Sequence, residues 1–300
     1  MLNYPPYEGG NRGVQEKRFI LYPSRNASTF KLVIEMNGVD MKTPIYQVDA
    51  FSDKAFGGNP AAICPLKEWI KPQLMQKIAS ENNLSETAFF VREGDVFALR
   101  WFTPKAEVDL CGHATLASAH VLFEELGYQK EEIKFETRSG RLIVKKVGDR
   151  LSMDFPADKM EQVQGPPILF QALGIKPSIF TFKSDDYMIV MDSEKEVASL
   201  NPDFRMLKEV DARGVIVTAP GDKVDFVSRF FAPRHNIDED PVTGSAHTKL
   251  TPYWSERLEK REMEARQISE RVGVLTVRDK YDRVEILGNA VTFMKGEITI

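Results

Sequence analysis

A short stretch in the first half of the chain combines several reactive groups. Residues 109–115 place a carboxylate, the thiol of Cys111 and the imidazole of His113 around Gly112, where small residues with helical spacing begin. The first turn of a helix presents unpaired backbone N–H groups and the positive end of the helix dipole. Beside that end we expect His113 to be neutral and to donate a hydrogen bond, and a partly exposed Cys111 to have a lowered thiol pKa. These groups predict proton-transfer or anion-binding chemistry.

A second stretch offers a similar arrangement. Residues 238–247 hold three acids, followed by Thr243 and the small residues Gly244 and Ser245. The third acid, Asp240, directly precedes a proline, and we interpret it as either a helix cap or a catalytic carboxylate. For the two acids before it we favour an ordinary capping loop.

Another candidate is Glu86, which stands at the edge of an apolar strand pattern between Leu84 and Phe89. A carboxylate screened from water can take a proton from a substrate carbon and return it. Taken alone, the segment favours an ordinary carboxylate in solvent, so the assignment depends on the other candidates.

An internal repeat links the first two stretches. Residues 100–104 and 229–233 share the order Arg, aromatic, Phe, any residue, Pro, and each copy is followed by acids and then by Gly-x-Ala at Gly112 and Gly244. The repeat predicts two similar halves, each directing the start of a helix toward a shared cleft. Two facing helix starts would hold a small anion from both sides. The alternative is that these glycines only allow close packing.

The surrounding pattern alternates short strands with helices, as expected for a mixed fold. Residues 1–40 lack a sustained period and are interpreted as an appended, poorly ordered segment, with a docking strand at 30–34 as the alternative. We expect halves at 41–155 and 156–300. The expected helices cover 68–79 and 112–126, and the expected strands cover 44–51, 60–63, 88–91, 96–102, 133–136, 142–145, 151–155, 274–277, 284–287 and 291–294.

Composition narrows the function classes. Forty basic residues against forty-four acidic ones give a net charge of −4, which argues against a nucleic acid or an anionic membrane as the main partner. No apolar run reaches the about 18 residues of a membrane helix, and the first residues lack the apolar core of a secretory signal. We therefore expect a cytoplasmic globular protein.

Known cofactor and metal patterns are not found in the sequence. It contains no nucleotide-binding glycine motif and no nucleophile elbow, and two cysteines and four histidines are not spaced as metal ligands. We expect neither a cofactor nor a metal.

Several motifs together resemble the phenazine-biosynthesis PhzF-like isomerase family. The resemblance runs in order from about residue 41 to residue 300 and is carried by residues 49–51, 56–62, 83–87, 100–104, 109–115, 239–247 and 288–291. It implies an α+β fold similar to that of diaminopimelate epimerase, in which two pseudo-symmetric α/β halves each wrap a curved sheet around a central helix. Such a fold places the active site between the halves and allows a homodimer.

The resemblance also implies roles for the candidate residues. Glu86 would be the general acid/base, with His113 and Asp240 orienting the substrate and stabilising the shifting charge. Ser245 and the backbone amides around Gly112 and Gly244 would hold a carboxylate.

The epimerases of this fold use two facing cysteines, and here the first position is Cys111 while the second is Thr243. A racemase with two thiols is therefore not expected. We expect a cofactor-independent isomerase that moves a proton on a small anionic metabolite. The alternatives are a racemase, epimerase or dehydratase that uses Cys111 opposite Thr243, and a non-catalytic metabolite-binding protein.

Overall fold

A computed structural model describes residues 18–23, 30–35, 42–177 and 180–300. The chain divides into two compact units, one formed by residues 1–42 with 299–300 and the other by residues 43–298. In the first unit, β1 (Arg18–Pro23) and β2 (Phe30–Glu35) form an antiparallel pair. A strand does form at 30–34, and its partner is β1. The other residues of the expected 1–40 segment lie outside the described part, so its poor order stays a prediction.

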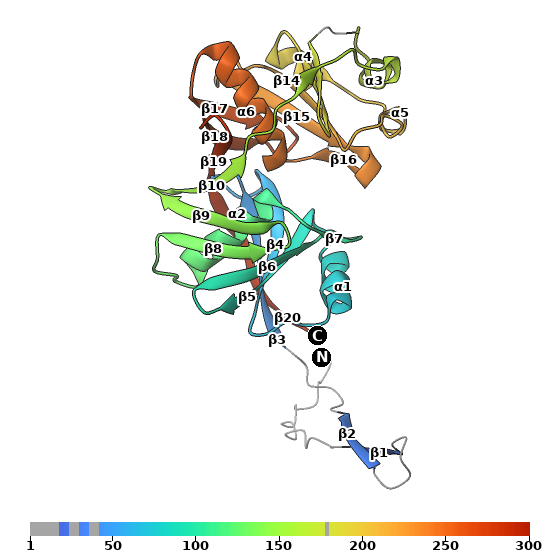
Figure 1. The fold of residues 1–300 in the computed structure, drawn as a ribbon, viewed down its shortest axis with the longest axis vertical. Coiled ribbons are helices and arrows are strands. Elements are labelled where there is room, and N and C mark those ends of the chain that lie inside the picture. Colours follow the sequence, from blue (N-terminus) through green and yellow to red (C-terminus); the bar gives the residue numbers. More distant parts are fainter. Residues whose placement is uncertain (1–17, 24–29, 36–41, 178–179) are drawn as a thin grey trace, which may run out of the picture. The chain divides into compact units, whose positions relative to one another are not determined.

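The first half of the larger unit is a row of paired strands (Figure 1). The pairs β4–β5 and β6–β8 are parallel, the other neighbours are antiparallel, and the two-residue β7 (Glu107–Val108) lies on β6. Two helices accompany them, α1 (Pro72–Asn82) and α2 (Gly112–His120). In order the strands are β3 (Lys42–Ala50), β4 (Asn59–Leu66), β5 (Glu86–Glu93), β6 (Val96–Phe102), β8 (Glu132–Thr137), β9 (Gly140–Val147) and β10 (Arg150–Pro156).

The second half repeats this order of pairings. Again one early pair, β13–β14, and one later pair, β15–β17, are parallel, and a short β16 (Ile237–Asp240) lies on β15. Helix α6 (Gly244–Leu258) takes the place that α2 has in the first half. The row consists of β12 (Thr181–Lys183), β13 (Tyr187–Val190), β14 (Val215–Pro220), β15 (Phe226–Ala232), β17 (Glu262–Gln267), β18 (Gly273–Asp279) and β19 (Arg283–Gly288).

The remaining elements extend the second half. Strand β11 (Glu161–Gln162) adds to β12, and three short helices lie between the strands. Their bounds are α3 (Pro167–Leu173), α4 (Glu194–Ser199) and α5 (Phe204–Leu207), and a 3₁₀ turn, η2 (Pro233–His235), precedes β16.

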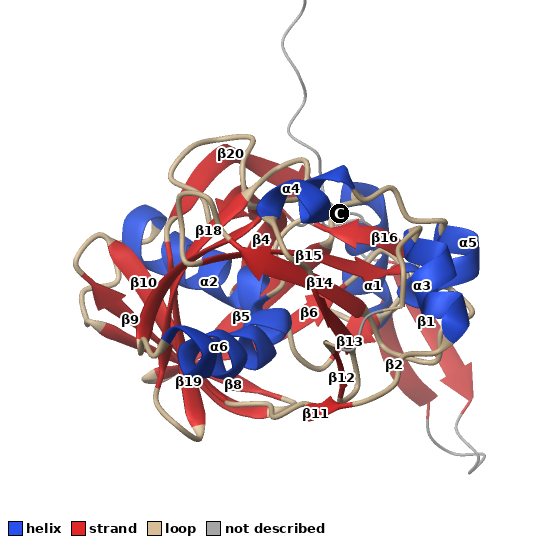
Figure 2. Cartoon of the chain, turned by 90° about the horizontal axis from the view of Figure 1, so that it is seen from above, coloured by secondary structure: helices blue, strands red, loops and turns tan. Residues whose placement is uncertain are grey.

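The equivalent strands β10 and β19 pair with each other, antiparallel from Leu151–Gly288 to Pro156–Arg283. This pair joins the halves into one sheet, and the symmetric order on either side confirms the two similar α/β halves. Helices α2 and α6 pack against strands of their own halves, and strands outnumber helices in the unit (Figure 2). In the described residues no helix combines the length and apolarity needed to cross a membrane.

The repeated Arg-aromatic-Phe motif has the same structural role in both halves. Arg100 makes a two-pronged ion pair with Glu107, with N–O distances of 2.7 and 2.8 Å. Arg229 makes the same pair with Glu239 at the same distances. Glu107 follows its arginine by 7 positions and Glu239 by 10, and this difference matches the longer second loop. Each ion pair joins the strand that carries the motif, β6 or β15, to the short strand that precedes the helix, β7 or β16.

Two helix expectations need adjustment. The first expected helix begins at Pro72 rather than 68, because proline lacks an N–H and its fixed φ suits the first helical turn. The second begins at Gly112 as expected, but its α-helical part ends at His120 and continues as a π-helical turn, η1 (Val121–Glu125).

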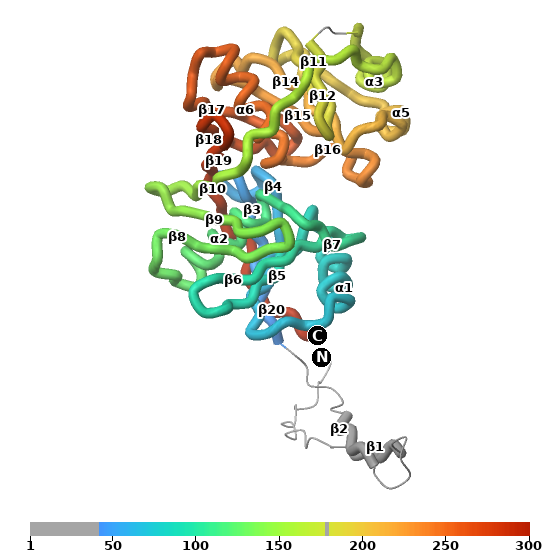
Figure 3. The backbone as a smooth tube through the Cα atoms, in the orientation of Figure 1, coloured from blue at the N-terminus to red at the C-terminus, as the bar shows by residue number. Residues whose placement is uncertain are grey.

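The last strand returns to the first half. After β19 the chain enters β20 (Ala290–Thr299), which lies beside β3, and a Cβ at Gly296 would lie 3.7 Å from Ile45. Figure 3 shows both crossings between the halves, outward after β10 and back into β20. Strand pairings thus cross the 155–156 boundary, and the division of domains there stays a prediction.

Candidate active site

The largest concentration of candidate residues lines one cavity of about 670 Å³ to which both halves contribute. Every site residue proposed from the sequence lines it: Glu86, Cys111, Gly112, His113, Asp240, Thr243, Gly244 and Ser245. Because these residues come from distant parts of the chain, their convergence is a property of the fold.

The starts of α2 and α6 meet in this cavity. A Cβ placed on either Gly112 or Gly244 would lie 3.8 Å from the Cα of the other glycine, which is ordinary van der Waals contact. Neither Cys111 nor Thr243, the residues before the two helices, makes a side-chain capping bond in the described structure. The N–H of Ala246 donates to the Thr243 carbonyl at 3.2 Å, and no side-chain cap competes with an anion for the earlier N–H groups of the two helices.

A chain of close contacts connects three of the candidates. Nε2 of His113 lies 3.1 Å from Oε2 of Glu86, and Nδ1 of His113 lies 3.5 Å from Sγ of Cys111. The side chain of His113 is only 7% exposed and that of Glu86 13%. Despite the short distance, neither the His113 Nε2 nor the Glu86 Oε2 has a well-aligned hydrogen-bond partner among the described residues. The pair is thus an ion-pair contact with bonding capacity left for a ligand.

The expected protonation of this cluster is corrected in two respects. Burial lowers the pKa of His113, but Cys111 and Glu86 outweigh it and raise that pKa well above its usual value. The direction of this pKa shift favours the charged imidazolium beside Glu86, whereas the helix end alone predicts a neutral donor. The thiol of Cys111 is buried rather than partly exposed, and burial together with Glu86 raises its pKa to about 11.

Asp240 is held from several sides. Its carboxylate accepts a hydrogen bond of 2.8 Å from Nδ2 of Asn59 and another from the hydroxyl of Thr243. Burial raises the pKa of Asp240 to about 6, partly offset by the charge of His113 and the bond from Thr243. Gln267 fixes the same loop, because its side chain donates to the Asp240 carbonyl at 2.7 Å and accepts from the Thr243 amide at 2.8 Å.

A charged network behind Ser245 was not foreseen from the sequence. Nη1 of Arg213 donates to Oγ of Ser245 at 3.0 Å, and the same guanidinium pairs with the fully buried Asp186. Lys249, one helical turn beyond Ser245, pairs with Asp158, Asp185 and Asp186 at 2.7, 3.0 and 3.2 Å. Since Ser245 Oγ accepts from Arg213, its own hydroxyl proton is free to point toward a ligand.

Sequence reasoning also missed Asn59 and Gln267 as parts of the site. Asn59 lies within residues 56–62, which contribute to the family resemblance without assigning Asn59 a role. In the structure Asn59 is fully buried, which its position between Gly58 and Pro60 in the sequence does not reveal. Residues 267–273 resemble a stretch of the same family, but that resemblance assigned Gln267 no role, and Arg213 lies in a segment without any motif.

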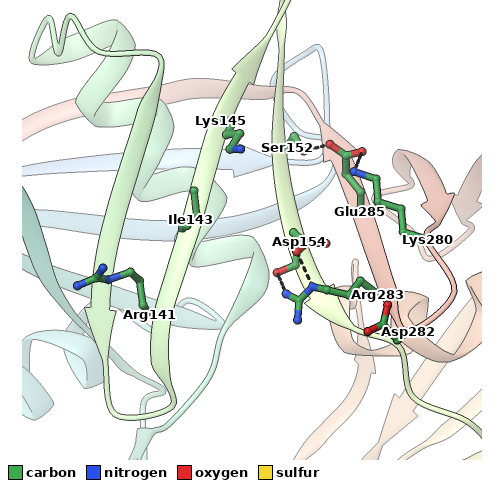
Figure 4. A pocket seen from close by; sticks show the side chains of 9 residues that line it. All are labelled: Arg141, Ile143, Lys145, Ser152, Asp154, Lys280, Asp282, Arg283 and Glu285. Carbon is green, nitrogen blue, oxygen red and sulfur yellow. Dashed lines mark hydrogen bonds and ion pairs between the residues drawn. The ribbon is translucent and has the colours of Figure 1, made fainter.

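A second, smaller cavity of about 350 Å³ lies on β9, β10 and β19 (Figure 4). Two ion pairs lie in it, Arg283 with Asp154 at 2.5 Å and Lys280 with Glu285 at 2.8 Å. None of the site residues expected from the sequence lines this second cavity.

Comparison with known proteins identifies the relatives of this chain. The family model for the phenazine biosynthesis-like proteins, PhzC-PhzF, matches residues 48–296. The chain belongs to this family. It is similar to an uncharacterized isomerase of Pseudomonas aeruginosa, with 52% identity over 259 residues that cover 86% of this chain and 99% of the relative.

Solved structures confirm the PhzF fold. A PhzF family protein of Enterococcus faecalis aligns with a TM-score of 0.84 and 48% identity, over 87% of this chain and all of that one. A hydroxyproline epimerase from Agrobacterium vitis aligns with a TM-score of 0.56 at 10% identity, over 86% of this chain and 93% of that one. The latter likeness concerns the fold alone, and it confirms the expected epimerase-like architecture.

Proposed function

We propose that this PhzF-like protein is a cofactor-independent isomerase that moves a proton within a small carboxylate-bearing metabolite bound in the cavity between the halves. The observation that carries the proposal is the contact of 3.1 Å between Glu86 and His113, directly beside the meeting point of the two helix starts. It places an acid/base pair next to a site built for an anion.

Glu86 acts as the proton carrier. A C–H bond of the substrate breaks as its proton passes to the carboxylate of Glu86, and the electron pair spreads into the adjoining unsaturated system. The positive charge of His113, which the proximity of Glu86 favours, stabilises the developing negative charge. Glu86 then returns the proton to a different carbon, so the reaction is balanced without an added reactant.

The substrate carboxylate is held by the helix starts. Free N–H groups after Cys111 and Thr243 and the hydroxyl of Ser245 supply donors without the cost of burying an unpaired cation. Asp240, the last residue of β16, can accept a hydrogen bond from the substrate. Because its pKa is about 6, it can also hold a proton near neutral pH.

The structure favours Glu86 over Cys111 as the base. A thiol whose pKa is raised to about 11 is almost entirely protonated at neutral pH. The residue at the second cysteine position, Thr243, has its hydroxyl engaged with Asp240 and receives a bond from Gln267. Neither position therefore supplies the thiolate that a two-thiol racemase needs.

The proposal is tested by solvent-deuterium incorporation. Candidate carboxylates are first selected from a metabolite library by thermal shift, then incubated with the protein in deuterated water and followed by mass spectrometry. We expect one deuterium at a carbon of the true ligand with wild-type protein and almost none with Glu86→Gln. Binding without exchange by wild-type protein would instead support the non-catalytic binding protein.

A further inference from the structure

We propose that Arg271 is a positioning residue for Asp240 and acts through Asn59, although Arg271 and Asp240 belong to the second half and Asn59 to the first. The inference rests on the role that the proposed function gives to Asp240. Arg271 does not line the cavity that holds Asp240. It acts through contacts with the loop of the first half that ends at Asn59.

The guanidinium of Arg271 binds this loop at three points. Its Nε donates to the carbonyl of Gly58 at 2.9 Å. Its Nη2 donates to the carbonyl of Gly57 at 2.9 Å and to Oδ1 of Asp49 at 2.8 Å. A planar guanidinium directs several donors at fixed angles, which a lysine ammonium cannot do. Because Gly58 directly precedes Asn59, these bonds decide where the amide of Asn59 lies.

The loop is also held from the first half and by the backbone of the second. The side chain of Asp49, on β3, is only 2% exposed, and its Oδ2 accepts a hydrogen bond of 2.8 Å from the amide of Phe56. A carboxylate buried to this degree needs a charged partner, which Arg271 supplies. In the opposite direction, the N–H of Gly58 donates to the carbonyl of Val272 at 3.0 Å. The loop before Asn59 is therefore fixed to the segment that carries Arg271.

That segment also contacts the loop around Asp240. Gln267 donates to the carbonyl of Asp240 at 2.7 Å, and Oγ of Ser269 donates to the carbonyl of the next residue at 2.8 Å. The amide of Asn59 closes the circuit by donating to Oδ1 of Asp240 at 2.8 Å. Residues 267–271 thus hold both the donor loop and the acceptor loop, and Arg271 is their link to the donor.

Loss of this link should change the titration of Asp240. The hydrogen bond from Asn59 favours the charged carboxylate, as does the bond from Thr243. The ionisable groups that act on Asp240 are His113, which lowers its pKa, and Glu86, which raises it. A substitution at Arg271 alters neither group, so a higher pKa of Asp240 would report the loss of the Asn59 bond.

The test follows the Asp240 carboxyl by NMR in the full chain, labelled with ¹³C at the aspartate side-chain carboxyls and assigned by comparison with Asp240→Asn. We expect Asn59→Ala to raise the pKa of Asp240 by about one pH unit. Arg271→Lys should raise it as well, because a lysine keeps the ion pair with Asp49 but cannot hold both carbonyls.

The matched control is Arg278→Lys. The side chain of Arg278 is 30% exposed, against 31% for Arg271, and it also has more than one partner, Glu262 at 2.8 Å and Glu285 at 3.3 Å. It does not line the cavity, so the pKa of Asp240 should stay unchanged.

A double variant separates positioning from a general loss of structure. If Arg271 acts through Asn59, Arg271→Lys adds no further shift in the Asn59→Ala background. Asp49→Asn covers the case in which Arg271→Lys does not fold. An amide has one oxygen and cannot accept from both Phe56 and Arg271, so this variant should also raise the pKa of Asp240. An unchanged pKa in folded Arg271→Lys, or an equal shift in both backgrounds, would overturn the proposal.

The measurement needs no substrate, so its result is independent of the proposed isomerase activity. If the pKa of Asp240 rises in Arg271→Lys while the acidic limb of deuterium exchange stays in place, Arg271 still positions Asp240. That result would contradict only the role of Asp240 in the proposed function.

Discussion

The side-chain amide of Asn59 donates a hydrogen bond of 2.8 Å to Oδ1 of Asp240, which joins the first residue of β4 to the loop that leads into α6. The same amide donates to the carbonyl of Val242 at 3.0 Å. The catalytic candidate of one half is therefore positioned by a residue of the other half.

Replacing that amide should change the titration of Asp240. In Asn59→Asp a second carboxylate faces Asp240, and like charges at this distance raise a carboxyl pKa. The acidic limb of the pH–rate profile for deuterium exchange should move above the value of about 6 that applies to wild-type Asp240. Asn201→Asp, at an exposed position, is the control and should leave the profile unchanged. An unshifted limb in Asn59→Asp would mean that Asp240 does not control the acidic limb.

Glu86 and Cys111 should differ sharply in their effect on turnover. A positioned general base contributes about 10²–10⁴-fold in rate, so Glu86→Gln should lose at least that factor while still binding the ligand. Cys111→Ala should keep most of the activity, because its thiol is protonated at neutral pH. The measurement compares kcat for exchange in the two variants. A dead Cys111→Ala beside an active Glu86→Gln would establish the cysteine-based racemase instead.

Removing the hydroxyl of Ser245 should weaken substrate binding. Arg213 donates a hydrogen bond to Oγ of Ser245, so the hydroxyl proton of Ser245 is directed to the ligand. Ser245→Ala loses one charge-assisted hydrogen bond, worth about 1.5–3 kcal/mol, and KM should rise by about tenfold or more. Ser199→Ala, on the exposed helix α4, should not change KM. If KM stays constant in Ser245→Ala, the carboxylate is bound elsewhere.

Stability in acid should depend on His247. This fully buried side chain contacts the Thr243 carbonyl through Nδ1, at 2.8 Å, and burial lowers its pKa to about 4. The unfolded chain protonates near 6.5, so the contribution of neutral His247 is complete above that pH and is lost as the pH falls toward 4. The loss amounts to about 3 kcal/mol at about 1.4 kcal/mol per pH unit.

The change to make is His247→Asn, whose amide can still donate to Thr243. Urea unfolding between pH 7 and pH 4 should show a smaller acid loss in this variant than in the wild-type protein. Asp240 opposes the effect in both proteins, because a raised pKa gives stability at low pH that is lost as the pH rises through about 6. If the free energy of unfolding falls equally in both proteins between pH 7 and pH 4, His247 does not take up a proton on unfolding.

The parts of the site that could be predicted from the sequence are those carried by local patterns. The helix starts at Gly112 and Gly244 follow from small residues after a strand motif, and the repeat made their approach predictable. The charge on His113 could not be predicted, because it depends on Glu86, which the parallel pairing of β4 and β5 brings to the cavity. Arg213 reaches Ser245 only through the packing of the second half, which no motif encodes.

The strand β20 also has a consequence for synthesis on the ribosome. Because β20 lies beside β3, the sheet of the first half gains this strand only after the strands of the second half have been translated. During that time the β3 edge is unpaired, and exposed strand edges are templates for association with other chains. The β3 edge of the nascent first half is therefore a site at which two incomplete chains can associate until β20 pairs with it.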